Sequence, residues 1–592
     1  MEIIKRDGRK VPFDQNKIID AVLAAFKEVD GEITDYAHEK AGNIADYIQD
    51  EARPLTVEEV QDLVENGLMS TKRKDVARAY ITYRYKRNVA RGINSDFIDA
   101  IGEKLKAANV QNQNANVDEY SFGGRMGEAT EVMTKNYALD YIISKKAKEN
   151  HLNNEIYIHD LGSYAVGMHN CLSIPFDDLL ANGFNTRQTD VRPAGSVNTA
   201  FQLVAVIFQL QSLQQFGGVS ATHLDWTMVP YVRKSFYKHY TNGLHYIESA
   251  KANTEIKLAL NKEEAQDVSI EDKKVYNHPM AYTYAIDMTI KEVHQAVEGL
   301  YHNLNTLQSR SGNQLPFTSI NYGTCTLFEG RLVTKALLEV SIEGLGKLHK
   351  TSVFPCGIFQ CMKGVNRKPG DPNYDLYQLA LKSTAQRLYP NYANVDWSGN
   401  AGYDINDPRT YFSTMGCRTA NGWDINGFGQ LKDGRGNICP VTIILPTLAM
   451  EAKNNLQGSD ANCKEEQISE FFLLLEQKIE EAKNMLIERF NYICSQNPSS
   501  AKFMYENGVI AGYVPEEGIR SALKHGTLAL GQLGLAETLQ ILIGKDHTTE
   551  EGMKLAKQIE QLFKDKCSKF KEEYKLNFGV YYTPKQLGLG VA

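Results

Sequence analysis

Residues 411–446 read YFSTMGCRTANGWDINGFGQLKDGRGNICPVTIILP, and this stretch decides how the rest of the chain is interpreted. It ends in the β-branched apolar run 441–445, which predicts a buried strand. Three turn dipeptides precede that strand, Asn-Gly at 421–422 and at 426–427 and Asp-Gly at 433–434, and they predict a loop. The sequence therefore predicts a long glycine-rich loop that leads into a core strand.

A lone cysteine, Cys417, lies on this loop between Gly416 and Arg418. Cysteines that serve packing are usually small buried residues inside apolar runs. A thiol on a tight glycine turn can instead be presented to a ligand, so Cys417 is a candidate for chemistry.

The chain has 592 residues, which predicts two or more domains. Its composition, 42% hydrophobic and 23% charged, is that of a globular protein. The net charge of −7 provides no basic surface, so nucleic acid is not an expected partner. The N-terminus MEIIKRDGRK lacks the apolar region of a signal peptide, and the longest apolar run, residues 203–208, is far shorter than the roughly 20 residues of a membrane span. We therefore expect a cytoplasmic protein without a membrane partner.

The cysteines predict reduced thiols, because their number is odd and their spacings are irregular. The nine are Cys171, Cys325, Cys356, Cys361, Cys417, Cys439, Cys463, Cys494 and Cys567. No Cys-X-X-Cys pair occurs among them, so no metal site is expected in this sequence. Cys439 lies near the loop in sequence, and we expect it to be a wall residue.

Residues 1–93 predict a first domain. Residues 3–13 predict a hairpin around an Asp-Gly turn, followed by a helix that Asp14 is placed to cap. Thr56 and Glu59 have the spacing of a capping box. Further amphipathic helices are predicted around 34–50, 56–69 and 75–91.

Basic residues gather near this hairpin and the first helix, namely Lys5, Arg6, Arg9, Lys10 and Lys17. Cations beside a turn and a helix N-terminus suit a polyphosphate. From composition alone, a solvated charged hairpin is the plainer explanation.

Residues 94–120 are predicted to be a linker, because they include an Asn- and Gln-rich stretch without hydrophobic period. Beyond it, Cys171 lies at a predicted strand start in MHNCLSIP, where a buried core residue is the plain explanation. Gly534 precedes a predicted helix whose free N–H groups can hold a phosphate, and tight packing would explain its glycines as well.

Taken in order, these segments resemble the anaerobic (class III) ribonucleotide reductases, which are glycyl radical enzymes. MGCR at residues 415–418, followed by GRGN at 434–437, resembles the finger loop of that family. The resemblance implies an α/β fold in which residues 121–592 form a ten-stranded α/β barrel of the glycyl radical enzyme type around a central finger loop. The N-terminal patterns KRDG and VPFD and the helix containing YITYRYK resemble an ATP-cone, a small and mostly helical regulatory domain.

The resemblance also implies roles for residues. Cys417 would carry a thiyl radical that abstracts the 3′-hydrogen of a ribose, Cys171 would donate a proton or hydrogen from the opposite side, and Asn437 would go with formate as reductant. The implied substrate-binding residues are His169, Asn170, Met415, Gly416, Gly534 and Ala536. The implied allosteric nucleotide contacts are Lys5, Arg6, Asp14, Lys17 and Lys86.

The implied activity is reduction of ribonucleoside triphosphates to 2′-deoxyribonucleoside triphosphates, under control by ATP, dATP and other dNTPs. The implied partners are a radical S-adenosylmethionine activase with an iron–sulfur cluster and a second copy of the chain in a homodimer, with higher oligomers formed with dATP. Residues 196–215 predict an apolar helix, which Phe216-Gly217-Gly218 and a second predicted helix through Phe236 follow. This helix–Gly-Gly–helix piece resembles the dimerisation region of the family, where plain helix packing would serve equally well. Members of the family carry a glycine that stores the radical and a four-cysteine zinc site on a C-terminal segment; we expect both on a segment absent from this sequence.

Two alternatives remain from the sequence. Another glycyl radical enzyme, such as a formate acetyltransferase or a dehydratase, would usually carry adjacent cysteines or a Cys–Glu pair on the loop and would lack an ATP-cone. A nucleotide-sensing regulator without catalysis would keep the cone and lose the chemistry, which the presence of Cys171, Cys417 and Asn437 argues against.

Overall fold

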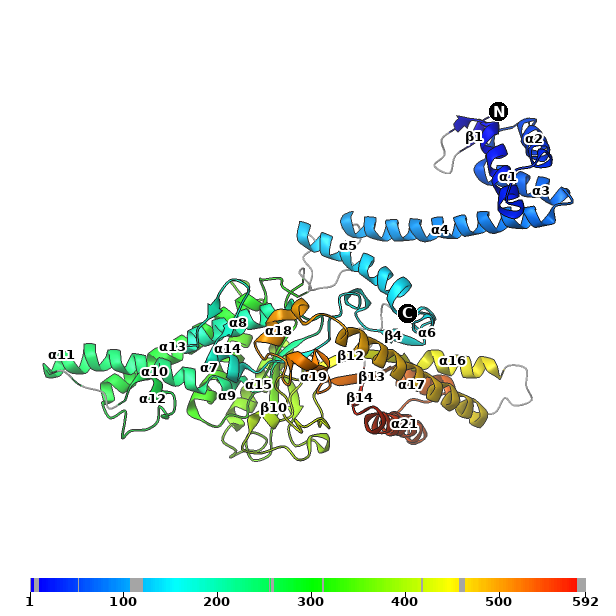
Figure 1. Ribbon diagram of the computed structural model, residues 1–592. Coiled ribbons are helices and arrows are strands. Elements are labelled where there is room, and N and C mark those ends of the chain that lie inside the picture. Colours follow the sequence, from blue (N-terminus) through cyan, green and yellow to red (C-terminus); the bar gives the residue numbers. More distant parts are fainter. Residues whose placement is uncertain are drawn as a thin grey trace. The chain divides into compact units, whose positions relative to one another are not determined.

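The chain forms two compact units, Met1–Glu103 and Lys104–Ala592, which Figure 1 draws in ribbon form. The computed structural model describes residues 2–4, 10–51, 53–106, 121–254, 256, 260–310, 314–416, 419–456 and 464–582.

Helices dominate the first unit. They are α1 (Gln15–Asp30), α2 (Asp35–Gln49), α3 (Val57–Ser70) and α4 (Lys74–Lys106). Three short strands form a sheet in the order β2 (Lys10–Pro12), β1 (Glu2–Ile4), β3 (Leu55–Thr56). The unit has its own core, in which Ile3 and Leu55 from the sheet join Val22, Phe26 and Leu68 from the helices. Burial of these apolar side chains is the main term that stabilises so small a unit.

Local signals in the first unit are confirmed. The two strands of the predicted hairpin pair, with Ile3 opposite Val11 in antiparallel β1 and β2, and the predicted Asp-Gly turn lies outside the described residues. Asp14 caps α1 by accepting the Asn16 N–H at 3.2 Å, and Thr56 with Glu59 forms the capping box of α3. The helix predicted for 75–91 extends from Lys74 to Lys106, so residues 94–106 of the predicted linker are helical.

The second unit contains two larger sheets. A parallel sheet has the order β11 (Asn391–Asn394), β10 (Cys356–Cys361), β9 (Thr318–Tyr322), β8 (Val219–Ala221), β5 (Leu172–Ser173). A mixed sheet has the order β14 (Asn577–Tyr582), β13 (Thr527–Leu533), β12 (Asn437–Ile444), β4 (Ile156–Ile158), with β4 antiparallel to β12. A small hairpin of β6 (Phe184–Asn185) and β7 (Asp190–Val191) completes the strands among the described residues.

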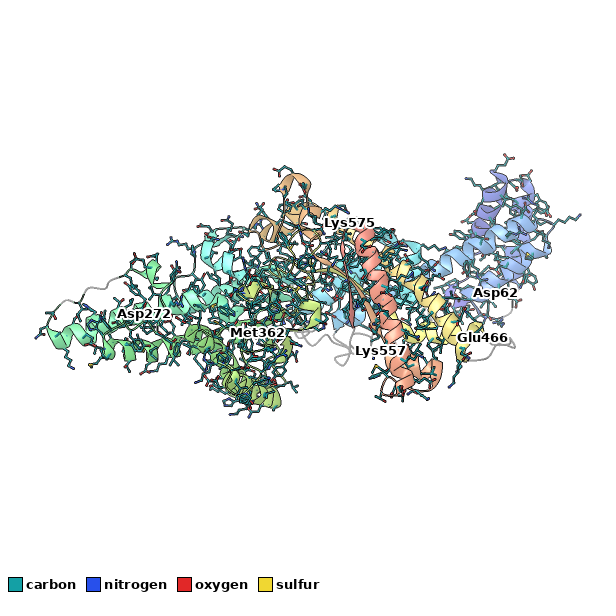
Figure 2. The ribbon with its side chains drawn as sticks, turned by 90° about the horizontal axis from the view of Figure 1, so that it is seen from below. Asp62, Asp272, Met362, Glu466, Lys557 and Lys575 are labelled. Carbon is teal, nitrogen blue, oxygen red and sulfur yellow. The ribbon has the colours of Figure 1, made fainter. Side chains whose placement is uncertain are left out.

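Helices connect and cover the strands, as expected for parallel sheets. They are α5 (Phe122–Tyr137), α6 (Lys145–Leu152), α7 (Phe176–Asn182), α8 (Val197–Ser212), α9 (Leu224–Thr227), α10 (Val229–Gly243), α11 (Ser249–Ala252), α12 (Lys262–Ala265), α13 (Pro279–Leu304), α14 (Phe328–Glu343), α15 (Tyr374–Arg387), α16 (Leu445–Asn455), α17 (Lys464–Cys494), α18 (Lys502–Glu506), α19 (Arg520–Leu523), α20 (Leu535–Ile543) and α21 (Glu550–Tyr574). Helix α17 packs on β12, and α21 packs on β14 and runs beside α17, as Figure 2 shows from below with Lys557 of α21 labelled. None of the helices in the described ranges is both long and apolar enough to cross a membrane.

The two sheets meet along an antiparallel seam beside β5. Leu172 forms a bridge with Gly436, the Asn170 N–H donates to the Ile438 carbonyl at 2.9 Å, and the Ser173 N–H donates to the Arg435 carbonyl at 2.9 Å. Among the described strands no pairing joins β11 to β14, so the sheets do not close by hydrogen bonds. The predicted α/β fold with parallel strands is confirmed; the strand pairing does not show the ten-stranded closed barrel.

Two strands differ from expectation in their extent. Strand β12 begins at Asn437, four residues before the apolar run that predicted it. Strand β8 follows Gly218 directly, where the sequence predicted a helix–Gly-Gly–helix piece. Only three residues long, VSA, it carries no alternating pattern that could reveal it.

Candidate active site

The finger loop, residues 411–436, crosses the polar face of the parallel sheet and is fixed by it. Ser220 Oγ of β8 and Asn321 Nδ2 of β9 both donate to the Thr414 carbonyl, each at 3.0 Å. Asn321 Oδ1 also accepts the Thr414 N–H at 3.1 Å. Both side chains are fully buried, so their hydrogen bonds fix the loop backbone in a place that water does not reach.

Neighbouring side chains extend this attachment. Ser319 Oγ of β9 accepts the Gly416 N–H at 2.8 Å, and Gln360 Nε2 of β10 donates to the Phe412 carbonyl at 3.0 Å. Because strand register places Ser319 beside Ser220, these hydroxyls share one face of the sheet. Side chains from three adjacent strands thus hold the first arm of the loop, residues 411–416.

The chain reverses at the tip of the loop. The Met415 N–H donates to the Thr419 carbonyl at 2.7 Å, and Thr419 Oγ1 donates to the Met415 carbonyl at 2.8 Å. Gly416 has φ +63°, and a Cβ there would lie 2.8 Å from the Phe317 ring, so both conformation and space favour glycine. Cys417 lies outside the described residues.

Cys171 lies next to the base of this tip. Its side chain is buried, its Sγ donates to Asn170 Oδ1 at 3.3 Å, and the Gly218 N–H donates to Sγ at 3.2 Å. A Cβ on Gly218 would be 3.5 Å from the Cα of Gly416. The structure therefore brings Cys171 and the residue preceding Cys417 to two sides of Gly218.

Asn437 opens β12 on the far arm of the loop. Its side chain is 2% exposed, and neither its Oδ1 nor its Nδ2 has a hydrogen-bond partner among the described residues. Leaving such groups unpaired costs about 1–3 kcal/mol each. An amide kept in this state has full capacity to bind a ligand through both atoms.

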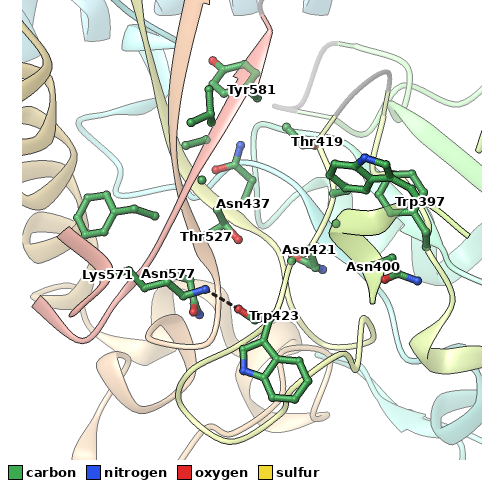
Figure 3. A pocket seen from close by; sticks show the side chains of 18 residues that line it. Trp397, Asn400, Thr419, Asn421, Trp423, Asn437, Thr527, Lys571, Asn577 and Tyr581 are labelled. Carbon is green, nitrogen blue, oxygen red and sulfur yellow. Dashed lines mark hydrogen bonds between the residues drawn. The ribbon is translucent and has the colours of Figure 1, made fainter. Parts of the chain in front are cut away.

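A cavity of about 530 Å³ lies between the finger loop and β14, and Asn437 lines it. Figure 3 shows Asn437 and Tyr581 on one wall and Thr419, Asn421 and Trp397 on the loop side. Its volume is within the range of small-molecule sites. The Oδ1 atom of Asn421, buried like Asn437, also has no partner among the described residues.

Two buried basic side chains hold the second arm of the loop, residues 419–436. Neither of them contacts a carboxylate among the described residues. Lys432 Nζ donates to the Asn421 carbonyl at 2.9 Å and to Gln430 Oε1 at 2.7 Å, and burial lowers the pKa of Lys432 to about 7. Arg435 Nε donates to the His525 carbonyl at 2.9 Å, and burial lowers the pKa of Arg435 to about 10. Their hydrogen bonds to backbone carbonyls hold in place the part of the loop that forms the cavity wall.

A cluster of charged side chains binds Asp433, near the end of the same arm of the loop. His223 Nε2 lies 3.0 Å from Asp177 Oδ2 and its Nδ1 lies 2.6 Å from Thr222 Oγ1, while Thr222 Oγ1 donates to Asp433. Burial opposes a charge on His223, but the carboxylates of Asp177, Asp433 and Asp225 outweigh it and raise its pKa to about 9. Burial raises the pKa of Asp433 to about 6, against the pull of His223. The imidazolium thus links α7 to the finger loop.

Sequence analysis missed this cluster. Asp433 stood in the predicted Asp-Gly turn and was interpreted only as a turn residue, although a charge next to a core strand is a usable signal. His223 and Thr222 follow the unrecognised strand β8 and carry no motif. Their partner Asp433 is 211 residues from Thr222, a contact that only the tertiary fold creates.

The predicted substrate-binding residues fall into two groups. Met415, Gly416 and Asn170 belong to the loop tip and the Cys171 side, as does His169, which is buried with Nε2 2.9 Å from Met504 Sδ; burial lowers the pKa of His169 to about 4.

Gly534 and Ala536 lie elsewhere, at the start of α20 beyond the C-terminal end of β13. The cavity is lined by Thr527 and Ala529 at the opposite end of that strand. Gly534 has φ +80° and a Cβ there would meet Pro446 at 2.4 Å, so packing and conformation already require glycine.

Of the predicted nucleotide contacts in the first unit, Asp14 is the α1 cap and Lys17 is exposed, with Nζ 3.6 Å from Asp14 Oδ2. Lys86 is part of α4. Lys5 and Arg6 lie outside the described residues.

The thiol of Cys439 packs in the core. Cys439 is fully buried on the outer face of β12, where its Sγ lies 3.5 Å from the Leu486 carbonyl of α17, and burial raises its pKa to about 12. It does not line the cavity. No cluster of three or more His, Cys, Asp or Glu suited to a metal ion occurs in the described part of the chain.

Comparison with known proteins identifies the family of the chain. The family model for anaerobic ribonucleoside-triphosphate reductase matches residues 113–586. The chain belongs to this family. An ATP-cone domain model matches residues 1–89 of this reductase, so the predicted family and its N-terminal domain are confirmed.

Relatives of the reductase extend along almost its whole length. The anaerobic ribonucleoside-triphosphate reductase of Escherichia coli is 30% identical over 99% of this chain and 76% of its own. That of Haemophilus influenzae is 28% identical over 99% of this chain and 77% of its own. The anaerobic ribonucleotide reductase of Thermotoga maritima, solved with citrate in the active site, has a similar fold, with a TM-score of 0.53 at 16% identity over 84% of this chain and 82% of that one.

Proposed function

We propose that this oxidoreductase converts ribonucleoside triphosphates to 2′-deoxyribonucleoside triphosphates by a thiyl radical mechanism, with formate as the reductant. The observation that carries the proposal is the meeting of Cys171 and the finger-loop tip at Gly218. Thr419 of the same loop and Asn437, whose amide has no hydrogen-bond partner among the described residues, line a cavity.

Cys417 is proposed to remove the 3′-hydrogen of the substrate ribose as a thiyl radical. Such a step needs the sulfur within about 3–3.5 Å of its target. The anchoring of Thr414 by Ser220 and Asn321 supports this role, because it fixes the arm that leads to the tip. A loop without buried anchors would not hold a reacting atom so closely.

Cys171 is proposed to deliver the proton that the departing 2′-oxygen needs. A thiol with an ordinary pKa of roughly 8.5 is mostly protonated at neutral pH and can act as this acid. The hydrogen bonds of its Sγ with Gly218 and Asn170 hold the sulfur in one orientation.

Asn437 is proposed to bind the reacting groups, the ribose hydroxyls or formate, through its two amide atoms, which have no hydrogen-bond partner among the described residues. Among the described residues, the side chains that line the cavity include no carboxylate and one cation, Lys571. Such a lining accepts a small anion without charge repulsion.

Larger-scale features of the family are proposed with it. The sheets would close into a ten-stranded barrel from residues 121–592, with residues 1–93 as the regulatory domain and 94–120 as the linker. The protein would act in the cytoplasm as a homodimer, with higher oligomers on binding dATP. Its radical would be produced by an S-adenosylmethionine activase with an iron–sulfur cluster and stored on a glycine.

An anoxic assay with activase, formate and a ribonucleoside triphosphate tests the function. Wild type should form the deoxynucleotide, and Cys171→Ser and Cys417→Ser should each lose at least about 10³-fold in kcat, because each removes a group that reacts with the sugar. Cys361→Ser is the control, since Cys361 lies on β10 next to Gln360 but outside the cavity lining. Equal activity of all four proteins would contradict the proposed function.

A further inference from the structure

A second polar group lies on the mixed sheet, on the face that lines the cavity. Thr442, Gly531 and Tyr581 are in register on β12, β13 and β14. A Cβ at Gly531 would lie 2.5 Å from Thr442 Oγ1 and 2.8 Å from the Tyr581 ring. Only glycine on the middle strand therefore lets the Tyr581 phenol cross over to Thr442.

The phenol meets a buried imidazole there. His159 follows β4, is 6% exposed, and has Nε2 at 2.7 Å from Thr442 Oγ1 and 3.0 Å from the Tyr581 hydroxyl. The two hydroxyls are themselves 3.1 Å apart. Residues from three strands and the end of a fourth thus bring three exchangeable groups to one point.

Contacts with its backbone carbonyl and with its ring hold the His159 imidazole in place. Arg489 Nη1 of α17 donates to the His159 carbonyl at 2.7 Å, and the guanidinium lies 4.8 Å from the ring centroids of both Tyr164 and Phe216. The Tyr157 ring packs edge-on against His159 at 4.9 Å. A fixed backbone and ring leave the imidazole with one orientation, toward the two hydroxyls.

The cluster opens to the site through one residue. Tyr581 lines the cavity that Asn437 lines, and Figure 3 shows the two side chains on the same wall. His159 and Thr442 are buried behind it and do not line the cavity. Of the three residues in the cluster, Tyr581 is the one that lines the cavity, so its phenol is the route by which a ligand there could exchange a proton with His159.

We propose that Tyr581 contacts the 3′-hydroxyl of the substrate ribose as a catalytic residue, and that His159 is a positioning residue that takes up a proton through it. The proposal rests on the proposed function. Tyr581 bonds a buried imidazole directly, whereas Asn577, which also lines the cavity, reaches the buried His525 ring only through the Asp424 carboxylate.

The step balances as follows. After the 3′-hydrogen is removed, the 3′-hydroxyl gives its proton to the Tyr581 oxygen while the Tyr581 proton moves to His159 Nε2. The C2′–O bond breaks, the leaving hydroxide takes the Cys171 proton and departs as water, and a C3′ carbonyl with a radical at C2′ remains. One proton is gained by His159 and one is lost by Cys171, and no electron is gained or lost in the step.

Tyr581→Phe tests the proposal in the activated full-length enzyme, because it removes only the hydroxyl. The expected result is a fall in kcat of about 10²-fold or more with KM for the nucleotide within about twofold and an unchanged Tm, as for loss of a group that acts only in the transition state. The control is Tyr574→Phe, whose hydroxyl lies 3.2 Å from Lys483 Nζ at the end of α21, outside the cavity lining; it should retain full activity.

His159→Gln separates proton uptake from hydrogen bonding. Glutamine can hydrogen-bond the two hydroxyls but cannot accept the proton, so kcat should fall as in Tyr581→Phe while Tm is kept. Wild-type kcat in either variant, or a loss that follows KM or Tm alone, would overturn the proposal and leave the proposed function intact. No reduction by the wild-type enzyme would overturn both.

Discussion

At the scale of single residues, Asn437 stands out because its buried amide has both atoms without partners among the described residues. Asn437→Ala should lower kcat at least about 10-fold while nucleotide binding is kept, because one reacting contact is lost and the cavity remains. Steady-state kinetics and equilibrium binding under anoxia measure the two effects. Asn455→Ala, on the exposed end of α16, is the matched control; turnover of Asn437→Ala equal to that of the control would show that its role is misassigned.

His223 gives a prediction for the pH dependence of stability. Its pKa is raised from 6.5 to about 9 in the folded protein, by Asp177 of α7, Asp433 of the finger loop and Asp225 of α9 acting against burial. Because the folded protein favours the protonated form of His223, the stabilisation is complete at pH values below the pKa of the unfolded state. It is lost as the pH rises through the folded-state pKa of about 9. Its size is at most roughly 3 kcal/mol.

The measurement is the Tm of wild type and His223→Gln from pH 6 to pH 10. Wild type should be the more stable protein at pH 6, and the difference should shrink to near zero above about pH 9. His349→Gln, at an exposed turn, should show no such trend. A difference that grew with pH would contradict the charge assigned to His223.

Sequence identified residues that belong to a motif and missed residues that act through the fold. Asn437 was named because GRGN follows MGCR, and Cys171 because its segment resembles the family; its place at a strand start predicted only a buried core residue. Ser220 and Asn321, which hold the loop, are ordinary strand residues whose function depends on which strands are neighbours. Gly534 and Ala536 lie at the other end of β13 from the cavity, and their contact with substrate stays a prediction.

At the scale of elements, the seam between the sheets depends on Gly436. A Cβ there would lie 1.9 Å from the Cys171 carbonyl oxygen, so Gly436→Ala must push β12 away from Cys171. We expect a loss of at least about 3 kcal/mol in unfolding free energy together with loss of activity. Chemical denaturation measures it.

The control for this change is Gly299→Ala in α13, where an added Cβ meets nothing within 4 Å. That substitution should be neutral or stabilise by about 0.5–1 kcal/mol. If Gly436→Ala unfolded at the same denaturant concentration as the control, the seam would not hold the two sheets together.

Elements with local signals were predicted well. The Asp14 cap, the Thr56–Glu59 capping box and the hairpin depend on residues within about ten positions of one another. Strand β8 and the seam at Leu172 and Gly436 depend on contacts across 264 positions or on a three-residue strand, and neither leaves a pattern in the sequence.

At the scale of the whole molecule, the first unit has a hydrophobic core of its own. A fragment of residues 1–103 should therefore fold and bind ATP and dATP, as the ATP-cone match over residues 1–89 predicts. Isothermal calorimetry with ATP, dATP and, as the control, adenosine measures it. A folded fragment that released no heat with either nucleotide would remove the regulatory assignment.

Whether the sheets close into a barrel was the feature least predictable from the sequence. The family resemblance implied a ten-stranded barrel, and the described strands form two sheets joined on one side at the seam. The cavity occupies the region between β14 and the finger loop, so the β14 side of the mixed sheet faces the site. Strand order of this kind follows from long-range pairing, for which a single sequence carries little information.

The central claim is that the sulfurs of residues 171 and 417 act on one sugar from opposite sides. A crystal structure of the full-length enzyme with a bound ribonucleoside triphosphate tests it most directly. The account predicts the Cys417 sulfur near C3′ and the Cys171 sulfur near the 2′-oxygen, each within about 3.5 Å, with Asn437 in contact with the ribose. A nucleotide bound away from both sulfurs, or sulfurs on the same side of the sugar, would contradict the account.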